Sequence, residues 1–252
     1  MTQREALFEF LQHLGDNTLI LSHRVSEWCG HAPVIEEDIA LANTALDLIG
    51  QAQMWLGLAA EIEGAGRDAD ALTYHRDSWD FRNLLLVERP NGDFGKTLMR
   101  QFLFDAWQAL MLEKLARSEH KQIAAIAGKA IKEVAYHLER SGDTVIGLGD
   151  GTEESHARMQ AALDDLWPYC GEMFNLDERY NALILANILP RMDDLRARWL
   201  SKVTDIFDDA TLVIPTDNFA HSGGKSGRHT EHLGHLLCEM QVLQRSYPGA
   251  KW

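Results

Sequence analysis

The longest apolar pattern in the sequence predicts a buried helix over residues 36–63. Its main stripe recurs at alternating spacings of four and three residues, which is the repeat of one helix face. The stripe consists of Leu41, Ala45, Leu48, Ala52, Trp55, Ala59 and Ile62. Because Ile39, Leu46, Ile49 and Leu56 widen the apolar surface around most of the helix, we expect this helix to lie inside a bundle.

The N-terminal segment predicts two consecutive helices. Thr2 followed by Glu5 is typical of a capping box, which opens the first helix, and Gly15 is expected to close it. Asp16 would then cap a second helix that runs towards Cys29.

Apolar spacing and capping residues also predict the elements of the remaining chain. They are short helical stretches over 68–87, helices over 94–117, 119–148, 153–169, 177–189, 191–208 and 231–246, and a loop over 210–229. Pro190 is expected to separate two of these helices, and Thr211–Ile214 is the single short candidate strand. The predicted fold class is all-α, with one domain over residues 1–252 built as a four-helix bundle with additional shorter helices.

Composition narrows the possible functions. The 252-residue chain carries a formal net charge of −14, which argues against binding to nucleic acid or to an anionic membrane surface. A polyanionic ligand would need a local basic patch, on this chain or on a partner protein. Cys29, Cys170 and Cys238 show no disulfide or metal-site spacing, and no signal peptide or membrane-spanning run is present. We therefore expect a cytoplasmic protein.

Two polar residues interrupt apolar stripes of predicted neighbouring helices. Asp105 lies in the stripe of the helix over 94–117, and His137 lies in that of the helix over 119–148. Because a buried polar group is costly unless it is paired, we expect a structural contact between the two side chains. Carboxylates and histidines on inner helix faces are also the ligands from which a bundle builds a di-iron site.

The other positions of such a di-iron site lack metal ligands. The site takes a glutamate from each of two helices and a Glu-x-x-His motif from each of two others. Val134 stands three residues before His137, where the glutamate is required. In the helix over 36–63, Leu48 and Gln51 occupy the corresponding pair.

The inner face of the second predicted helix offers Leu21, Val25 and Trp28 in place of a glutamate, unless Glu27 turns inward. The vestigial ligand positions are therefore Val25, Leu48, Gln51, Asp105, Val134 and His137. At best two of these six residues bind iron, so we predict neither a metal centre nor a catalytic residue on this chain.

Two further motifs have both a chemical and a structural interpretation. Histidines at 229, 232 and 235 are potential zinc ligands, but steps of three residues rotate around a helix, so capping and packing are favoured. The loop over 223–228 has glycines that suit a phosphate, yet it lacks the spacing of a P-loop. Fixing the last helix or touching a partner is the favoured role of this loop.

Several longer motifs resemble one protein family over nearly the whole chain. They are Leu14–Asn17, Ser26–Pro33, Asp47–Ala52, Asn83–Glu88, Lys132–His137 and the ending over 223–252 with its HTEHLG and EMQ segments. In this order they resemble the ferritin-like C subunits of bacterial ring-1,2-phenylacetyl-CoA epoxidases, the multicomponent oxygenases of aerobic phenylacetate degradation.

The resemblance implies a partner subunit that is not itself catalytic. In that family the A subunit resembles a catalytic di-iron protein that binds phenylacetyl-CoA. A small B subunit and a reductase with flavin and an iron–sulfur cluster complete the NADPH- and O2-dependent system. The resemblance implies that this chain holds no cofactor. It also implies that the chain stabilises the A subunit and completes the surroundings of the A subunit's active site. Two alternatives stay open: an independent di-iron oxygenase or ferroxidase, and a stand-alone acyl-CoA-binding module that uses the loop over 223–228.

Overall fold

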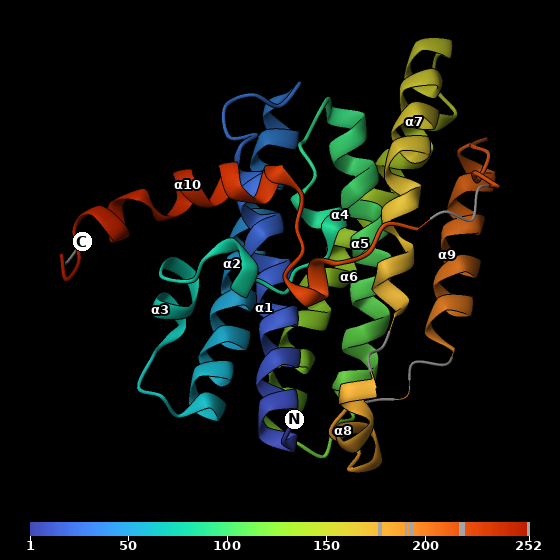
Figure 1. The fold of residues 1–252 in the computed structure, drawn as a ribbon. Helices are drawn as coiled ribbons and strands as arrows, with labels where there is room; N and C mark the ends of the chain where they lie inside the picture. Colours follow the sequence, from blue (N-terminus) through green and yellow to red (C-terminus); the bar gives the residue numbers. More distant parts are fainter. Residues whose placement is uncertain (176–177, 190, 192–193, 217–219, 251–252) are drawn as a thin grey trace. The chain divides into compact units, whose positions relative to one another are not determined.

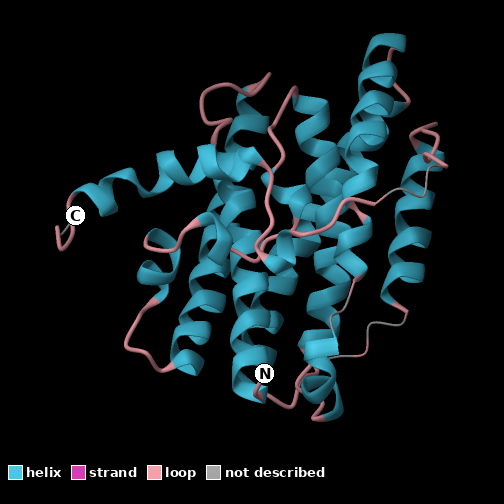
Figure 2. Cartoon of the chain, in the orientation of Figure 1, coloured by secondary structure: helices cyan, strands magenta, loops and turns pink. Residues whose placement is uncertain are grey.

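The computed structural model describes residues 1–175, 178–189, 191, 194–216 and 220–250. These residues form ten α-helices joined by loops and short 3₁₀ turns, and none of them forms a strand (Figure 2). The all-α prediction is therefore confirmed, and the short candidate strand over Thr211–Ile214 does not form. Thr211 has a φ of 57°, and the backbone N–H of Val213 donates to the Gln160 side chain at 2.9 Å instead of to a neighbouring strand.

The first compact unit comprises Met1–His31, Ile35–Pro90 and the described residues from Ser222 onward. Its helices are α1 (Gln3–Ser26), α2 (Ile35–Glu63), α3 (Ala69–Tyr74), α4 (Leu85–Glu88) and α10 (Glu231–Ser246). The long helices α1 and α2 pack side by side in antiparallel directions (Figure 1). Helices α2 and α10 begin and end within one residue of their predicted bounds.

The second compact unit comprises Ala32–Val34 and the described residues between Asn91 and His221. Its helices are α5 (Phe94–Leu115), α6 (Lys121–Gly149), α7 (Glu153–Leu166), α8 (Asn181–Leu185) and α9 (Leu195–Asp209). Helices α5 and α6 form a second long antiparallel pair. Each unit thus contains one helix pair of the kind from which four-helix bundles are built. The prediction of one domain over residues 1–252 stays a prediction.

Several predicted helices are shorter or divided in the structure. Between 68 and 87 the chain forms α3, a 3₁₀ turn over Ser78–Asp80, and α4, and the Asp68 side chain caps α3 at the backbone N–H of Ala71, 2.8 Å away. Of the helix predicted over 177–189, only α8 is α-helical among the described residues. The helix predicted over 191–208 corresponds to α9. The predicted helix start at Asp177 and the predicted break at Pro190 lie outside the described residues.

The two helices predicted at the N-terminus are one continuous helix, α1. The capping box of Thr2 and Glu5 is present, but Gly15 and Asp16 lie inside the helix. A Cβ atom at Gly15 would lie 2.7 Å from the side chain of Leu56, so glycine allows α1 and α2 to approach closely here. Asp16 caps no helix, because its carboxylate is bound by residues far away in the sequence.

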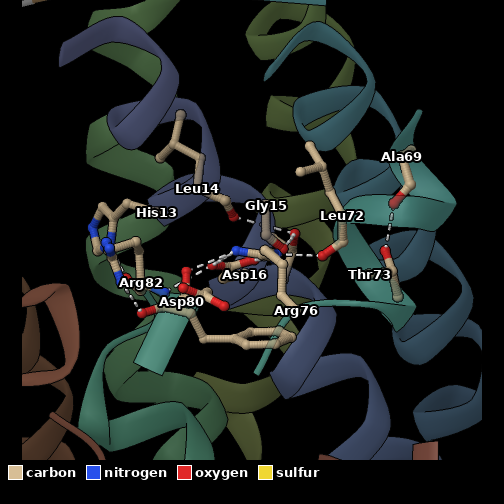
Figure 3. Close-up of polar contacts among 12 residues, drawn as sticks. His13, Leu14, Gly15, Asp16, Ala69, Leu72, Thr73, Arg76, Asp80 and Arg82 are labelled. Atoms are coloured by element: carbon tan, nitrogen blue, oxygen red, sulfur yellow. Dashed lines mark hydrogen bonds and ion pairs between the residues drawn. The ribbon is translucent and has the colours of Figure 1, made fainter. Parts of the chain in front are cut away.

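A buried ion pair between Asp16 and Arg76 ties α1 to the segment that follows α3 (Figure 3). Both terminal nitrogens of the guanidinium contact the carboxylate, with 3.0 Å between Nη1 and Oδ2. Arg82 donates its backbone N–H to the same carboxylate at 2.8 Å. Arg76 also donates to the carbonyls of Leu72 and Asp80, so several hydrogen-bond acceptors surround its guanidinium. The pair thereby holds an irregular segment against a helix.

The apolar stripe of α6 faces the core as predicted. It consists of Ile123, Ala127, Ala130, Val134, His137 and Ser141, all buried. Apolar periodicity therefore identified the inward face of this helix correctly. Among the described residues, no helix combines the length and the apolar character that crossing a membrane requires.

Replacing Arg76 with methionine should strongly destabilise the first unit. The variant keeps an extended side chain but leaves the Asp16 carboxylate buried without its ion-pair partner, which costs about 3–5 kcal/mol of unfolding free energy. Urea denaturation of the wild type and the variant measures this difference. As a control, Arg67→Met breaks a partly exposed pair with Glu63 and should cost no more than about 1 kcal/mol. Equal losses in the two variants would contradict a special role for the buried pair.

Candidate functional site

All six vestigial ligand positions lie in the cores of their units. They are Val25 on α1, Leu48 and Gln51 on α2, Asp105 on α5, and Val134 and His137 on α6. None of these residues is more than 2% exposed. Glu27, the alternative to Val25, does not turn inward: it is the C-cap residue of α1, its side chain is 43% exposed, and Arg24 donates to it at 2.9 Å.

The carboxylate of Asp105 is held by two hydrogen bonds inside the second unit. Gln101 Nε2, one turn earlier on α5, donates to Oδ1 at 2.7 Å, and Ser141 Oγ on α6 donates to Oδ2 at 3.0 Å. His137 acts on the same carboxylate electrostatically. Gln101 is not among the predicted site residues, although its spacing of four residues from Asp105 on one helix is a signal for this contact.

Burial raises the pKa of Asp105 from 3.8 to about 6, because removal from water penalises the charged carboxylate. The electrostatic interaction with His137 and the hydrogen bonds from Gln101 and Ser141 lower the pKa of Asp105 but do not offset the burial. Near neutral pH, Asp105 is therefore an anion that its surroundings disfavour relative to water.

The six residues do not fit a di-iron centre. A site of this kind requires several carboxylates together with histidines. Asp105 supplies the one carboxylate and His137 the one imidazole of the set, while Gln51 is a neutral amide and the other three side chains are hydrocarbon. In the part of the chain that the structure describes, no group of three or more His, Cys, Asp or Glu side chains is placed to hold a metal ion.

A buried carboxylate in the first unit, Glu88 at the end of α4, joins two of the motifs that carry the family resemblance. Asn83 Nδ2 donates to Oε2 at 2.9 Å, and Nδ1 of His229 lies 2.8 Å from the same oxygen. Thr230 donates both its backbone N–H, at 2.7 Å, and its hydroxyl, at 2.8 Å, to Oε1. These bonds anchor the start of α10 to α4, which supports the packing interpretation of His229.

The glycine-rich loop over 223–228 packs against the segment over 79–83. A Cβ atom at Gly224 would lie 2.1 Å from the carbonyl oxygen of Asn83. Gly227 has a φ of 77°, and a Cβ atom there would lie 2.2 Å from the carbonyl oxygen of Trp79. Both positions therefore need glycine for close backbone approach. This packing positions the chain just before α10, which is the structural role favoured for the loop.

One face of α2 is apolar and exposed, which corrects the expectation that the whole helix lies inside a bundle. Ile35, Ile39 and Leu46 are 70%, 56% and 66% exposed, and Ile49 beside them is 38% exposed. We call these four residues the α2 apolar face. Periodicity detects apolar positions, but it does not distinguish a face that packs in the core from one that binds another protein.

The surface around the α2 apolar face is open to another helix. A mostly apolar groove of about 310 Å³ lies between α1 and α2, and Leu46 and Ile49 line it together with Ser26 and Cys29. Along the same side of α2, a Cβ atom at Gly50 or Gly57 would meet nothing within 4 Å. Exposed aliphatic side chains next to small residues suit close packing of a helix from a partner protein.

A family model and a known protein that resemble this sequence both point to phenylacetate catabolism. The sequence matches the family described as "Phenylacetic acid catabolic protein" over residues 1–252. It is 48% identical over 246 residues to the C subunit of 1,2-phenylacetyl-CoA epoxidase from Escherichia coli (strain K12). This similarity covers 98% of the chain and 99% of the relative.

Asp105→Asn should remove a pH dependence of stability. Because the folded carboxyl has the higher pKa, the folded state binds more protons between about pH 4 and 6, and stability increases as the pH falls through that window. A pKa raised from 3.8 to about 6 corresponds to roughly 3 kcal/mol, which the wild type lacks above pH 6. The asparagine variant should thus be as stable as the wild type or more stable at pH 7.5.

Thermal melts of wild type and Asp105→Asn between pH 4 and 8 measure this effect, and the advantage of the variant should shrink towards pH 4. Asp143→Asn, which alters an exposed carboxylate on α6, is the matched control and should leave the profile unchanged. A large loss of stability in Asp105→Asn at pH 7.5 would mean that the native carboxylate is stabilised by its surroundings.

Proposed function

Because the chain belongs to the phenylacetic acid catabolic protein family, we propose that it is the non-catalytic partner subunit of a cytoplasmic phenylacetyl-CoA 1,2-epoxidase complex. The near full-length similarity to one component of the Escherichia coli epoxidase supports membership of such a complex. The catalytic di-iron subunit, a small B subunit and a flavin and iron–sulfur reductase are the other proposed components. Phenylacetyl-CoA is bound mainly by the catalytic subunit in this proposal.

The observation that carries the non-catalytic role is the chemistry of the six buried ligand positions. A di-iron oxygenase needs its carboxylates at these core positions, whereas this chain has side chains such as Val25, Leu48 and Val134 there, which cannot bind a metal. The remaining polar residues are Gln51, Asp105 and His137, and Asp105 is engaged by hydrogen bonds inside its own unit. Oxygen activation is therefore assigned to the partner.

The α2 apolar face is the proposed contact surface for the catalytic subunit. Exposure of these apolar side chains to water is unfavourable, and their burial by a partner lowers the free energy of the complex. The groove beside Leu46 and the open surface at Gly50 and Gly57 allow a partner helix to approach closely. Covering this face would stabilise the helices of both subunits and complete the surroundings of the partner's active site.

Metal content tests the non-catalytic role directly. After anaerobic loading with Fe(II) and desalting, the purified chain should retain close to no iron, because the core positions lack carboxylates. A double variant, Asp105→Asn with His137→Asn, is the control and should give the same result. Two irons per wild-type chain that the double variant loses would instead favour an independent di-iron oxygenase or ferroxidase.

Co-purification tests the proposed contact surface. The double variant Ile39→Asp with Leu46→Asp is co-expressed with the catalytic subunit. The amount of catalytic subunit that co-purifies should fall at least about tenfold relative to the wild type, because two charges would become desolvated in the interface. Circular dichroism should show an intact fold, since both side chains are exposed in the free chain.

The matched control for this experiment lies on α10. Val242→Asp with Leu243→Asp changes two side chains that are 52% and 50% exposed, and it should leave co-purification unchanged. Full recovery of the catalytic subunit by the α2 variant would contradict the proposed surface. Tight binding of phenylacetyl-CoA by the isolated chain would contradict the scaffold role and favour an acyl-CoA-binding module.

A further inference from the structure

The second unit contains a pocket of about 380 Å³ that the proposed partner role does not use. It lies where two 3₁₀ turns after α7, Trp167–Tyr169 and Gly171–Phe174, face α9 and residues 214–216 and 220. Its volume is at the lower end of the range of roughly 300–1,000 Å³ that is typical of small-molecule sites. The size suits a ligand with a single ring, and it is too small for a complete CoA thioester.

Aromatic rings form the walls of this pocket and are held in fixed positions. Trp167 and Trp199 are stacked with ring centroids 5.5 Å apart, and Phe174 lies at 5.2 Å from Trp199 in a tilted arrangement. The indole N–H of Trp199 donates to the carbonyl of Leu103 on α5 at 3.1 Å, and this tryptophan is 3% exposed. A flat apolar ligand would therefore meet a wall that is already organised.

Arg196 is the one charged side chain among the described residues that line the pocket. It is exposed and makes no ion pair with a described carboxylate, in contrast to Arg198 on the same helix, which donates to Glu113 at 2.7 Å. The planar fork of an arginine matches the geometry of a carboxylate on a ligand.

The other described lining residues are uncharged. Cys170 is buried, its Sγ donates to the carbonyl of Leu166 at 3.7 Å, and burial raises the pKa of its thiol, so the thiol stays neutral. In a chain with a net charge of −14, most surfaces repel an anion. A cation in the described lining of the pocket therefore offers a local attraction to a negative ligand.

We propose that this pocket binds a small aromatic carboxylate. Its ring would lie against Trp167 and Trp199, and its carboxylate would receive hydrogen bonds from the Arg196 guanidinium. This site is independent of the partner role, because it uses neither the α2 apolar face nor the vestigial ligand positions.

Isothermal titration of the full chain with phenylacetate and benzoate tests the proposal. Phenylacetate should bind with a Kd below roughly 1 mM and change the tryptophan fluorescence, because its ring contacts two indoles. Phenylacetamide, which lacks the charge, and cyclohexylacetate, which lacks the flat ring, should each bind at least about tenfold more weakly.

Two substitutions on α9 separate a specific site from a general charge effect. Arg196→Gln should weaken phenylacetate binding about tenfold or more, while Arg198→Gln, with the same change of charge on the same helix, should leave it unchanged. Arg196→Lys keeps the charge without the fork and should recover part of the affinity. Arg196 is exposed, so its variants should retain the thermal stability of the wild type.

Three outcomes would overturn the proposal. The first is no heat and no fluorescence change with phenylacetate or benzoate up to roughly 10 mM. The second is equal weakening by Arg196→Gln and Arg198→Gln, which would show a general effect of charge. The third is equal affinity for phenylacetate, phenylacetamide and cyclohexylacetate, which would show that neither the guanidinium nor the aromatic walls recognise the ligand.

Discussion

The burial of carboxylates is the constraint on which the architecture of the first unit depends. A carboxylate removed from water is stable only where direct donors replace its hydration. Asp16 receives the guanidinium of Arg76 and a backbone N–H, and Glu88 receives donors from Asn83, His229 and Thr230. Each carboxylate therefore fixes segments that are far apart in the sequence, including irregular ones that helix packing alone would not position.

Asp105 in the second unit meets the same constraint incompletely. Its two hydrogen bonds come from neutral donors, Gln101 and Ser141, and it has no guanidinium like that of Arg76. Burial consequently dominates and raises the pKa of this carboxyl. In a metal site a bound cation would compensate for such a buried carboxylate, whereas Gln101 and Ser141 offer only neutral hydrogen-bond donors.

Local signals in the sequence predicted structure well where the structure is determined locally. The bounds of α2 and α10 follow from apolar periodicity and flanking residues. Gly15 and Asp16 misled because they are typical of helix ends, while here they serve contacts with residues far away in the sequence. Periodicity placed Asp105 in the core, as its burial bears out, but it also counted the exposed Leu46 towards the interior. The pocket around Arg196 had no sequence signal, since only the fold brings its walls together.

The exposed side chains of α2 also limit how the proposed complex can be held together. Complete burial of an aliphatic side chain contributes about 1.5–3 kcal/mol, so Ile35, Ile39 and Leu46 supply several kcal/mol between them. Association of two proteins costs about 4–15 kcal/mol in lost translational and rotational freedom, and stable interfaces bury about 1,600 Å². The α2 apolar face is therefore sufficient as the centre of an interface but not as the whole of it. A stable partner must add a wider rim, and in a chain of net charge −14 a rim with complementary basic groups on the catalytic subunit satisfies this requirement with the least electrostatic repulsion.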